Sequence, residues 1–379
     1  MMKRVAFVIN FNKDSWLGGF NYFKNLFIFL HEFNEKKITP IIITDDIRKV
    51  EEIVEQTGNE VLVSKLFSNS SFIIRIVNKL LILLFGKNIY LESFFKKNNI
   101  SALSHSGFTG KKSKIKSFPW FPDFQELYFP ENFSKRNLFF RRLDVFFSKI
   151  HSTRIIVSSQ QVQNDLKKIN FSAYNHSNII KHYTHLPKKE NLISLSELKG
   201  KYRFEKNYFF LPNHYWTHKN HILVLKAINL IKEKFNCIII STGQIHDHRN
   251  PENFNKIKEY INKNNLSKFY KILGIIPFTD VISFMLNSIA LINSSKSEGW
   301  SNTVEQAKSL GIKILLSDIK VHREQANNNC NFFDPNDENK LGKLFMSLNL
   351  KNPNEINYED CQKKLKHMQE EFVKKYLNF

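Results

Sequence analysis

The stretch that decides the fold is SSKSEGWSNTVEQAKSLGIKILLSDIKVHREQ, residues 294–325. An apolar run, Ile289–Asn293, leads into it, and a second apolar run, Ile312–Ser317, lies within it. Short apolar runs of this kind are typical of β-strands. The second run is apolar on both faces, as a strand is when helices cover both sides of a parallel sheet. The two runs therefore predict two strands of a parallel sheet.

The residues between these two strands predict a turn and a helix. Gly299 allows a tight turn after Glu298. Ser301 or Asn302 can cap the helix that follows, and Gly311 can end it. A helix N-terminus exposes unpaired N–H groups and the positive end of the helix dipole, which suits a diphosphate. We therefore expect an anion-binding site here, with Glu298 facing it from the loop.

Strand-like runs alternate with helical patterns along the whole chain, which favours parallel sheets covered by helices. The predicted strands of the first half are Val5–Ile9, Ile38–Thr44, Glu60–Val63, Ile100–Ser104, Ser117–Trp120 and Ile155–Ser158. Those of the second half are Tyr208–Leu211, Ile238–Thr242, Lys271–Leu273, Ile289–Asn293 and Ile312–Ser317. The predicted helices include Phe20–Phe33, Ile47–Gln56, Phe72–Phe85, Asn137–Ile150, Gln160–Lys168 and Tyr358–Tyr376.

The chain of 379 residues is long enough for two domains of ordinary size. A polar, lysine-rich stretch, Pro187–Lys206, separates the two series of strands and is predicted to be the linker. We expect one domain over residues 1–190, a second over 200–355, and a final helix within 356–379.

Composition limits the partners and the compartment. The net charge of +21 favours neutral or acidic partners, such as nucleic acid, anionic lipid or a nucleoside diphosphate. The three cysteines, Cys237, Cys330 and Cys361, have no CxxC spacing, which argues against a disulfide scaffold or a zinc site. The N-terminus leads straight into a strand without a signal-peptide pattern, and no apolar run reaches the ~18 residues of a spanning helix. These features predict a cytoplasmic protein.

Residues 298–311 resemble glycosyltransferase family 4, retaining enzymes of GT-B fold. That family carries a Glu-x7-Glu motif, whose first Glu contacts the donor sugar and whose second holds the ribose hydroxyls. Glu298 matches the first position. The second falls on Gln306, and its neighbour Glu305 points about 100° away around the helix. The resemblance therefore leaves the ribose contact to either Gln306 or Glu305.

Further blocks of the second half resemble the same family. Lys219 matches a lysine that contacts the donor diphosphate, although the arginine that many relatives have five or six residues earlier is replaced by His214 or Asn213. Gly243 and Gly274 match two glycine turns that flank the nucleobase. The resemblance also implies donor contacts from the turn and helix start, namely Gly299, Trp300, Ser301 and Asn302.

Three features of the first half carry weaker signals. Gly18 and Gly19 follow the first strand, where the family has a Gly-Gly loop facing donor and acceptor; a plain turn is the alternative. His105 follows the fourth strand, near an active-site histidine of some relatives; a surface or turn histidine is the alternative. Asp123 lies in a Trp-x-Pro-Asp-Phe-Gln-like block and either orients the acceptor hydroxyl or serves the turn.

The stretch Phe72–Phe85 is strongly apolar and carries Arg75 and Lys79. Such a helix can insert its apolar face into a bilayer while its cations attract anionic lipid. Packing against the sheet is the alternative. The first interpretation predicts peripheral attachment to the inner face of the plasma membrane.

The resemblance implies an α/β protein of GT-B fold, with two Rossmann-like domains facing a central crevice. It implies transfer of a sugar from a nucleotide-sugar to a saccharide or lipid-linked acceptor with retention, as in bacterial surface polysaccharide assembly. No cofactor or metal is expected, and no Asp-x-Asp metal-diphosphate motif occurs. The rival enzyme is a GT-B sugar-nucleotide epimerase. A basic nucleic-acid-binding protein is a further rival, but no RRM, helix-turn-helix or zinc pattern supports nucleic acid as a partner.

Overall fold

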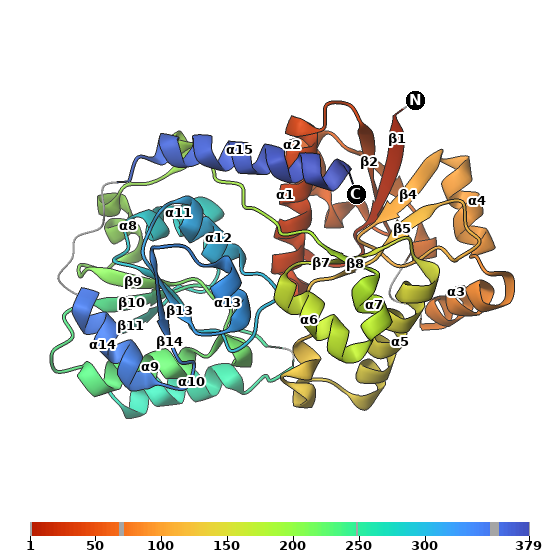
Figure 1. Ribbon diagram of the computed structural model, residues 1–379. Coiled ribbons are helices and arrows are strands. Elements are labelled where there is room, and N and C mark those ends of the chain that lie inside the picture. Colours follow the sequence, from red (N-terminus) through yellow and green to blue (C-terminus); the bar gives the residue numbers. More distant parts are fainter. Residues whose placement is uncertain (1, 68–71, 248, 349–355, 379) are drawn as a thin grey trace. The chain divides into compact units, whose positions relative to one another are not determined.

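The computed structural model describes residues 2–67, 72–247, 249–348 and 356–378 (Figure 1). The chain forms two units, each built on parallel strands packed against helices. Unit 1 comprises Met1–Pro130, Ser134–Tyr183 and His367–Phe379, and unit 2 comprises Glu131–Phe133 and Thr184–Lys366. Each unit is described by itself below.

Unit 1 contains a five-stranded parallel sheet in the order β3-β2-β1-β4-β5 and a three-stranded parallel sheet, β6-β7-β8. A hydrogen bond from Thr153 N, just before β7, to Ser117 O on β5, at 2.8 Å, links the two sheets. The strands are β1 Lys3–Val8, β2 Ile38–Thr44, β3 Glu60–Val63, β4 Ile100–Ser104, β5 Lys116–Phe118, β6 Trp120–Phe121, β7 Ile155–Val157 and β8 Ser177–Ile179. The helices are α1 Leu17–Phe33, α2 Glu51–Thr57, α3 Phe72–Phe85, α4 Ile89–Lys97, α5 Lys135–His151, α6 Gln160–Ile169 and α7 Phe171–Asn175.

The core of unit 1 forms between α1 and the first sheet. Phe20, Phe23, Phe27 and Leu30 recur at helical spacing on α1 and are all buried. The ring of Phe27 meets that of Phe7 on β1 edge-on, with centroids 5.0 Å apart. Burying each such side chain contributes about 1.5–3 kcal/mol, so this face holds α1 at the carboxyl end of β1.

Unit 2 contains a six-stranded parallel sheet in the order β11-β10-β9-β12-β13-β14. In Figure 1, α9, α10 and α14 lie on one side of it, and α8, α11 and α12 on the other. The strands are β9 Tyr208–Leu211, β10 Ile238–Ser241, β11 Tyr270–Ile272, β12 Leu291–Asn293, β13 Ile314–Ser317 and β14 Cys330–Phe333. The helices are α8 Leu195–Tyr202, α9 His221–Ile231, α10 Asn253–Lys263, α11 Phe278–Leu286, α12 Asn302–Ser309, α13 Lys320–Gln325 and α14 Glu338–Leu348.

The strand order of unit 2 reverses between β9 and β12. The chain builds β9, β10 and β11 outward in one direction, then returns to place β12 on the other side of β9. In open parallel sheets of this kind, ligands bind beyond the carboxyl ends of the two strands that flank such a reversal. This rule directs the search for a site to the loops after β9 and β12.

The last helix, α15 (Tyr358–Leu377), belongs in part to each unit. Near its start, Tyr358 OH donates to the carbonyl of Pro187 at 2.8 Å, within unit 2. Near its end, Phe372 contacts the ring of Phe29 at 6.1 Å, within unit 1. Its two ends are thus anchored separately.

Several predicted elements differ from the structure. The predicted strand Ser117–Trp120 is split into β5 and β6, because Pro119 has no N–H to donate to a ladder. The predicted linker over 187–206 contains α8, which begins with a capping box at Ser194 and Glu197. Strands β8 and β14 and helix α4 were not predicted. Both strands lie at sheet edges, where partial exposure weakens the apolar pattern.

Candidate functional site

Lys219 stands in the loop that follows β9. After Thr217–Lys219 forms one turn of 3₁₀ helix, Asn220 adopts a left-handed conformation with φ 59° and α9 begins at His221. Asn tolerates this backbone better than most residues do, which accounts for a Lys-Asn pair at this point. The side chain of Asn220 donates to Pro335 O at 2.8 Å and so holds the turn in place.

Glu298 stands in the loop that follows β12, on the other side of the strand-order reversal. Two hydrogen bonds tie this loop to the loop that carries Lys219. Ser294 Oγ donates to Lys219 O at 2.8 Å, and Lys296 N donates to His218 O at 2.7 Å. The two residues predicted to contact the donor are therefore brought together by the fold, although 79 positions separate them in sequence.

The two side chains form a largely buried ion pair, with Lys219 Nζ 2.6 Å from Glu298 Oε1 and side chains only 13% and 9% exposed. Burial by itself opposes ionisation of Glu298. The charge of Lys219, with smaller contributions from His218 and His322, outweighs burial and lowers the pKa of Glu298 to about 2. Glu298 is thus a carboxylate at neutral pH.

Histidines surround this pair and are held neutral. Burial lowers the pKa of His214, of His221 and of His322 to about 4 each. The pKa of His218 is lowered further by burial and by Lys219. The ion pair therefore supplies the charge of the site, and the imidazoles supply neutral hydrogen-bonding groups.

His322, on α13, has one ring nitrogen directed at the protein and one without a partner. Its Nδ1 lies 2.9 Å from Ser317 O, and because a carbonyl only accepts, Nδ1 carries the proton. Nε2 is then an unprotonated acceptor, and it is buried without a hydrogen-bond partner among the described residues. His322 and Glu298 each influence the pKa of the other, which places this acceptor in the same site.

A buried polar network joins the ends of the strands. Asn293, at the end of β12, accepts from Asn213 Nδ2 at 3.3 Å and from Ser295 Oγ at 2.7 Å. It also donates to Ser301 Oγ at 2.9 Å. Ser301 occupies the N-cap position of α12, one of the two positions that the sequence predicted. Its hydroxyl, however, makes no capping hydrogen bond to the helix. The neighbouring turn and helix-start residues Gly299, Trp300 and Asn302 directly adjoin this network.

Gln325 of α13 clamps the start of α12. Its side chain accepts from Ser301 N at 3.1 Å and donates to Ser301 O at 2.8 Å and Glu305 Oε1 at 3.0 Å. Glu305 also pairs with Lys308 at 2.9 Å, so its carboxylate is engaged within the protein. The neighbouring Gln306 makes no side-chain hydrogen bond that is resolved among the described residues. Of the two, Gln306 is therefore the side chain whose amide can hydrogen-bond to a ligand.

The two glycine turns predicted near the nucleobase lie beside each other. Gly243 N donates to Gly274 O at 2.8 Å. Gly243 has φ 140°, and a Cβ there would lie 2.7 Å from Asn213 O, so only glycine fits between these loops. Around Gly274 (φ 70°) there is open space. Both residues follow strands on the same side of β9, at the edge of the sheet where Lys219 lies.

In unit 1, His105 belongs to a buried chain of hydrogen bonds. Its Nε2 lies 2.6 Å from Tyr22 OH, its Nδ1 lies 2.9 Å from Ser104 Oγ, and Ser104 Oγ lies 2.9 Å from Tyr376 OH. Burial lowers the pKa of His105 to about 3, so the ring is neutral. A catalytic role for His105 stays a prediction, and it would require one of these two hydrogen bonds to be exchanged for a substrate.

The Gly18-Gly19 pair opens α1 as predicted, but its two members differ. A Cβ on Gly19 would lie 2.3 Å from the ring of Trp16, so Gly19 is needed for Trp16 to pack over the helix start. Gly18 is exposed and has open space around it. Of the two, only Gly18 presents its backbone to an incoming ligand in this structure.

Asp123 serves the local turn. Its carboxylate accepts from Gln125 N at 3.2 Å, and Arg141 of α5 lies 3.7 Å from the same carboxylate. Arg141 also pairs with Glu126 at 2.8 Å. The acceptor contact predicted for Asp123 stays a prediction.

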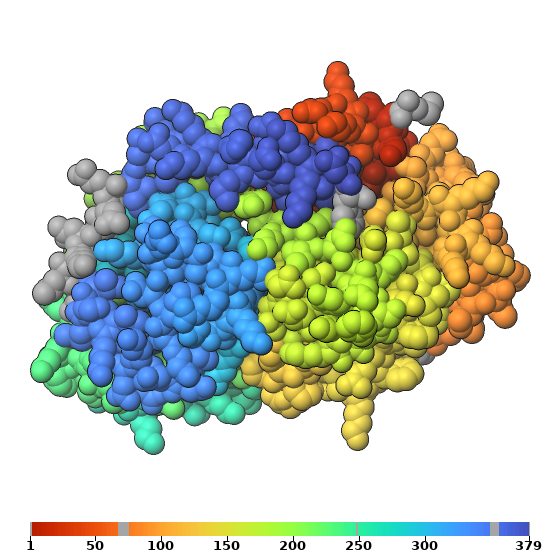
Figure 2. All heavy atoms as spheres, in the orientation of Figure 1, coloured from red at the N-terminus to blue at the C-terminus, as the bar shows by residue number. Residues whose placement is uncertain are grey.

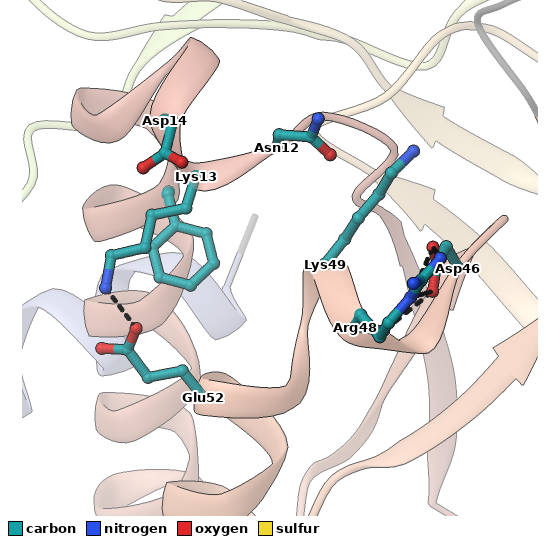
Figure 3. A pocket seen from close by; sticks show the side chains of 8 residues that line it. Asn12, Lys13, Asp14, Asp46, Arg48, Lys49 and Glu52 are labelled. Carbon is teal, nitrogen blue, oxygen red and sulfur yellow. Dashed lines mark hydrogen bonds and ion pairs between the residues drawn. The ribbon is translucent and has the colours of Figure 1, made fainter.

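A cavity of about 590 Å³ opens in unit 1 beyond the carboxyl ends of β1 and β2 (Figure 3). Its charged lining is balanced and mutually paired, with Lys13 2.5 Å from Glu52 and Arg48 bonded to Asp46. We assign no ligand to it. It is lined by Asn12, Lys13, Asp14, Phe20, Asp46, Arg48, Lys49 and Glu52.

Sequence reasoning missed three residues of the unit 2 site: Asn293, His322 and Gln325. Asn293 ends a predicted strand, and His322 and Gln325 follow one. Ligands bind beyond the carboxyl ends of parallel strands, and this rule was the signal that could have found all three. Their partners come from other elements, and those partners are visible only in the folded chain.

A family model matches the stretch of chain that carries this site. Residues 196–368 match the family model described as glycosyl transferases group 1, which covers most of unit 2. This stretch includes the Lys219–Glu298 pair, Gln306 and Gln325. A search of the curated proteins found no match.

Solved glycosyltransferases share the fold over nearly the whole chain. One from Rickettsia africae ESF-5 is 14% identical with a TM-score of 0.66, covering 98% of this chain and 93% of that one. Anabaena Alr3699/HepE, solved with UDP and glucose, is 13% identical with a TM-score of 0.68, covering 98% and 95%. WaaG, involved in lipopolysaccharide biosynthesis, is 11% identical with a TM-score of 0.61, covering 98% and 95%. These likenesses confirm the predicted α/β GT-B fold.

Proposed function

We propose that this protein transfers a hexose from a nucleotide-sugar to a saccharide or lipid-linked acceptor with retention of configuration, in bacterial surface polysaccharide assembly. The buried Lys219–Glu298 pair at the strand-order reversal carries the proposal, because it lies inside the matched stretch and at the edge where such sheets bind ligands. The UDP and glucose held by the Anabaena neighbour suggest the class of donor. The family 4 assignment is part of this proposal.

Each residue of the site has a role in the proposed reaction. The bond between the sugar C1 and the diphosphate oxygen breaks, the acceptor oxygen bonds to C1, and the proton of the acceptor hydroxyl passes to the departing diphosphate. Lys219 and the N-terminus of α9 offset the charge that develops on the departing diphosphate. Glu298 contacts the sugar, and Gln306 holds the ribose. The proposal needs no metal, so transfer should persist in EDTA.

A panel of UDP-, GDP- and dTDP-sugars tests the proposal by thermal stabilisation, since a ligand that binds the native state raises the unfolding temperature. Stabilisation by at least one of them is expected, and none by any would contradict the proposal. Release of free nucleoside diphosphate only when an acceptor is present separates transfer from epimerisation. Binding to random duplex DNA at physiological salt would instead favour the nucleic-acid alternative.

The ribose contact is predicted to come from Gln306. Glu305 is already paired with Lys308 and Gln325, whereas Gln306 has no such partner. Gln306→Ala should therefore weaken donor binding by about 1–2 kcal/mol, the value of a hydrogen bond, as measured by titration. Gln306→Glu should preserve or improve affinity. If Glu305→Ala weakens the donor and Gln306→Ala does not, Glu305 holds the ribose.

A second part of the proposal is attachment of unit 1 to the inner face of the plasma membrane. No described helix is both long and apolar enough to cross a bilayer. Between positions 76 and 85, helix α3 buries Ile82 but exposes most of its other apolar side chains. Figure 2 shows α3 and α4, in orange, at the surface of unit 1. The exposed set, here called the α3–α4 apolar surface, is Val77, Leu80, Leu83, Leu84, Phe85, Ile89 and Tyr90.

Cations surround this surface. The exposed turn that carries Lys111, Lys112 and Lys114 is held at the end of α3 by the bond from Lys112 N to Gly86 O at 2.9 Å. Glu92 is the sole acidic residue between positions 72 and 116, and it is buried. Lys79, by contrast, pairs with Asp144 at 2.6 Å, and the side chain of Arg75 lies outside the described part of the chain. Apolar insertion with a cationic rim suits an anionic bilayer.

We expect the protein to sediment with vesicles that contain anionic lipid at low salt and to be released at high salt. Each lysine near the surface contributes about 1 kcal/mol, and salt screens that term. Leu84→Glu should abolish sedimentation. Phe171→Glu, which changes another exposed apolar side chain, on α7, should not. Equal binding to neutral vesicles, or none to either kind, would contradict the attachment.

A further inference from the structure

In the proposed reaction, Lys219 is needed both by Glu298 and by the diphosphate of the donor. Within residues 2–67, 72–247, 249–348 and 356–378, Lys219 and Glu298 each have the other as their only ion-pair partner, at 2.6 Å. A diphosphate that takes Lys219 as its counter-ion therefore removes the cation that Glu298 relies on. Both side chains are largely buried, so water compensates little.

We propose that the pair opens on donor binding and acts as a specificity device that favours the sugar-bearing donor over the free nucleoside diphosphate left after transfer. This inference rests on the proposed function, because it takes Lys219 as the diphosphate contact. A nucleotide-sugar brings hydroxyl groups that donate to Glu298 when Lys219 turns to the phosphates. A free nucleoside diphosphate takes Lys219 but offers no sugar hydroxyl to Glu298. Re-formation of the pair then favours release of the product.

Among the residues that the structure describes, no other cation lies beside Glu298 to replace Lys219. The titratable groups that face it are Lys219 and His218 from the loop after β9 and His322 from α13. Both imidazoles are neutral near pH 7, because burial lowers the pKa of His322 to about 4 and that of His218 further. His322 Nδ1 donates to Ser317 O, which leaves Nε2 an acceptor that cannot donate to a carboxylate.

The sign of the pH effect follows from this arrangement. Loss of Lys219 to a phosphate raises the pKa of Glu298 from about 2, because burial then acts unopposed. The complex with free nucleoside diphosphate therefore binds more protons than the empty protein does. Its formation takes up protons, and its affinity rises as the pH falls. A donor whose sugar hydroxyls bond to the carboxylate causes less uptake.

The test compares wild type with Glu298→Gln in calorimetric titrations with UDP, GDP and dTDP in turn, and with their sugar conjugates. Glutamine keeps the size of the side chain and removes the charge. The variant should bind the free diphosphate at least tenfold more tightly than wild type, with no similar gain for the sugar conjugate. Asp318→Asn, which removes one negative charge at an exposed pair with Arg323, is the matched control and should change neither affinity.

A second measurement compares proton uptake by wild type and by Glu298→Gln. Titration at pH 7.5 in buffers of different ionisation enthalpy should show proton uptake on diphosphate binding, and the uptake should be absent in Glu298→Gln. The proposed opening of the pair is overturned if the variant binds the free diphosphate no more tightly than wild type, or if wild type takes up no protons. This holds even where nucleotides bind to wild type and Lys219→Ala lowers their affinity. If no nucleotide or conjugate binds wild type at all, the proposed function itself fails.

Discussion

Glu298→Gln is expected to lower turnover by two or more decades while leaving the fold intact. Lys219 holds the carboxylate ionised before the donor binds. In the proposed reaction the carboxylate contacts the sugar, and that contact strengthens as positive charge develops at C1. A hundredfold loss corresponds to about 2.7 kcal/mol of transition-state stabilisation. Glutamine fills the same volume, so a similar unfolding temperature should accompany the loss.

The measurement is kcat at saturating donor and acceptor, with the unfolding temperature of each variant recorded beside it. Asp318→Asn removes a carboxylate from the same unit at an exposed site and should leave kcat unchanged. Near wild-type turnover in Glu298→Gln would remove Glu298 from the mechanism. The tighter binding of free diphosphate expected for this variant is a separate readout and does not depend on turnover.

Lys219→Ala is expected to lower kcat/KM by about 10²–10³, the usual cost of losing a group that stabilises developing negative charge. Affinity for the free nucleoside diphosphate should fall with it, because the same ammonium neutralises the product. The substitution also leaves Glu298 buried without its counter-ion, so part of the loss reflects the surroundings of the carboxylate.

Lys296→Ala is the matched control for Lys219→Ala. Lys296 is an exposed lysine in the loop after β12, and its hydrogen bond to His218 O uses the backbone and survives the change. It should leave kcat/KM near the wild-type value. Unchanged diphosphate affinity in Lys219→Ala would show that Lys219 serves the turn before α9 and not the phosphates.

Many strands could be predicted closely from the sequence, including the edge strand β3. Strands β2, β3, β4 and β9 begin and end at the predicted residues, and so does helix α3. Central strands such as β9 are buried on both faces, so they read as unbroken apolar runs that glycine, proline or polar residues bound. Strands β8 (SNI) and β14 (CNFF) are short and contain an asparagine, so neither forms such a run and both were missed. The edge strand β3 (EVLV) keeps three consecutive apolar residues and was predicted.

What the sequence by itself determined is the α/β class, most of the strands, and the local chemistry of the two blocks that carry Lys219 and Glu298. The tertiary structure alone decided that these side chains form a buried pair. That contact depends on β12 returning beside β9, and a strand order is a long-range arrangement that local patterns do not encode. The tertiary contacts are also the ground for proposing Gln306, and not Glu305, as the ribose contact. These two residues are adjacent in sequence, and only the packing of Gln325 and Lys308 against Glu305 distinguishes them.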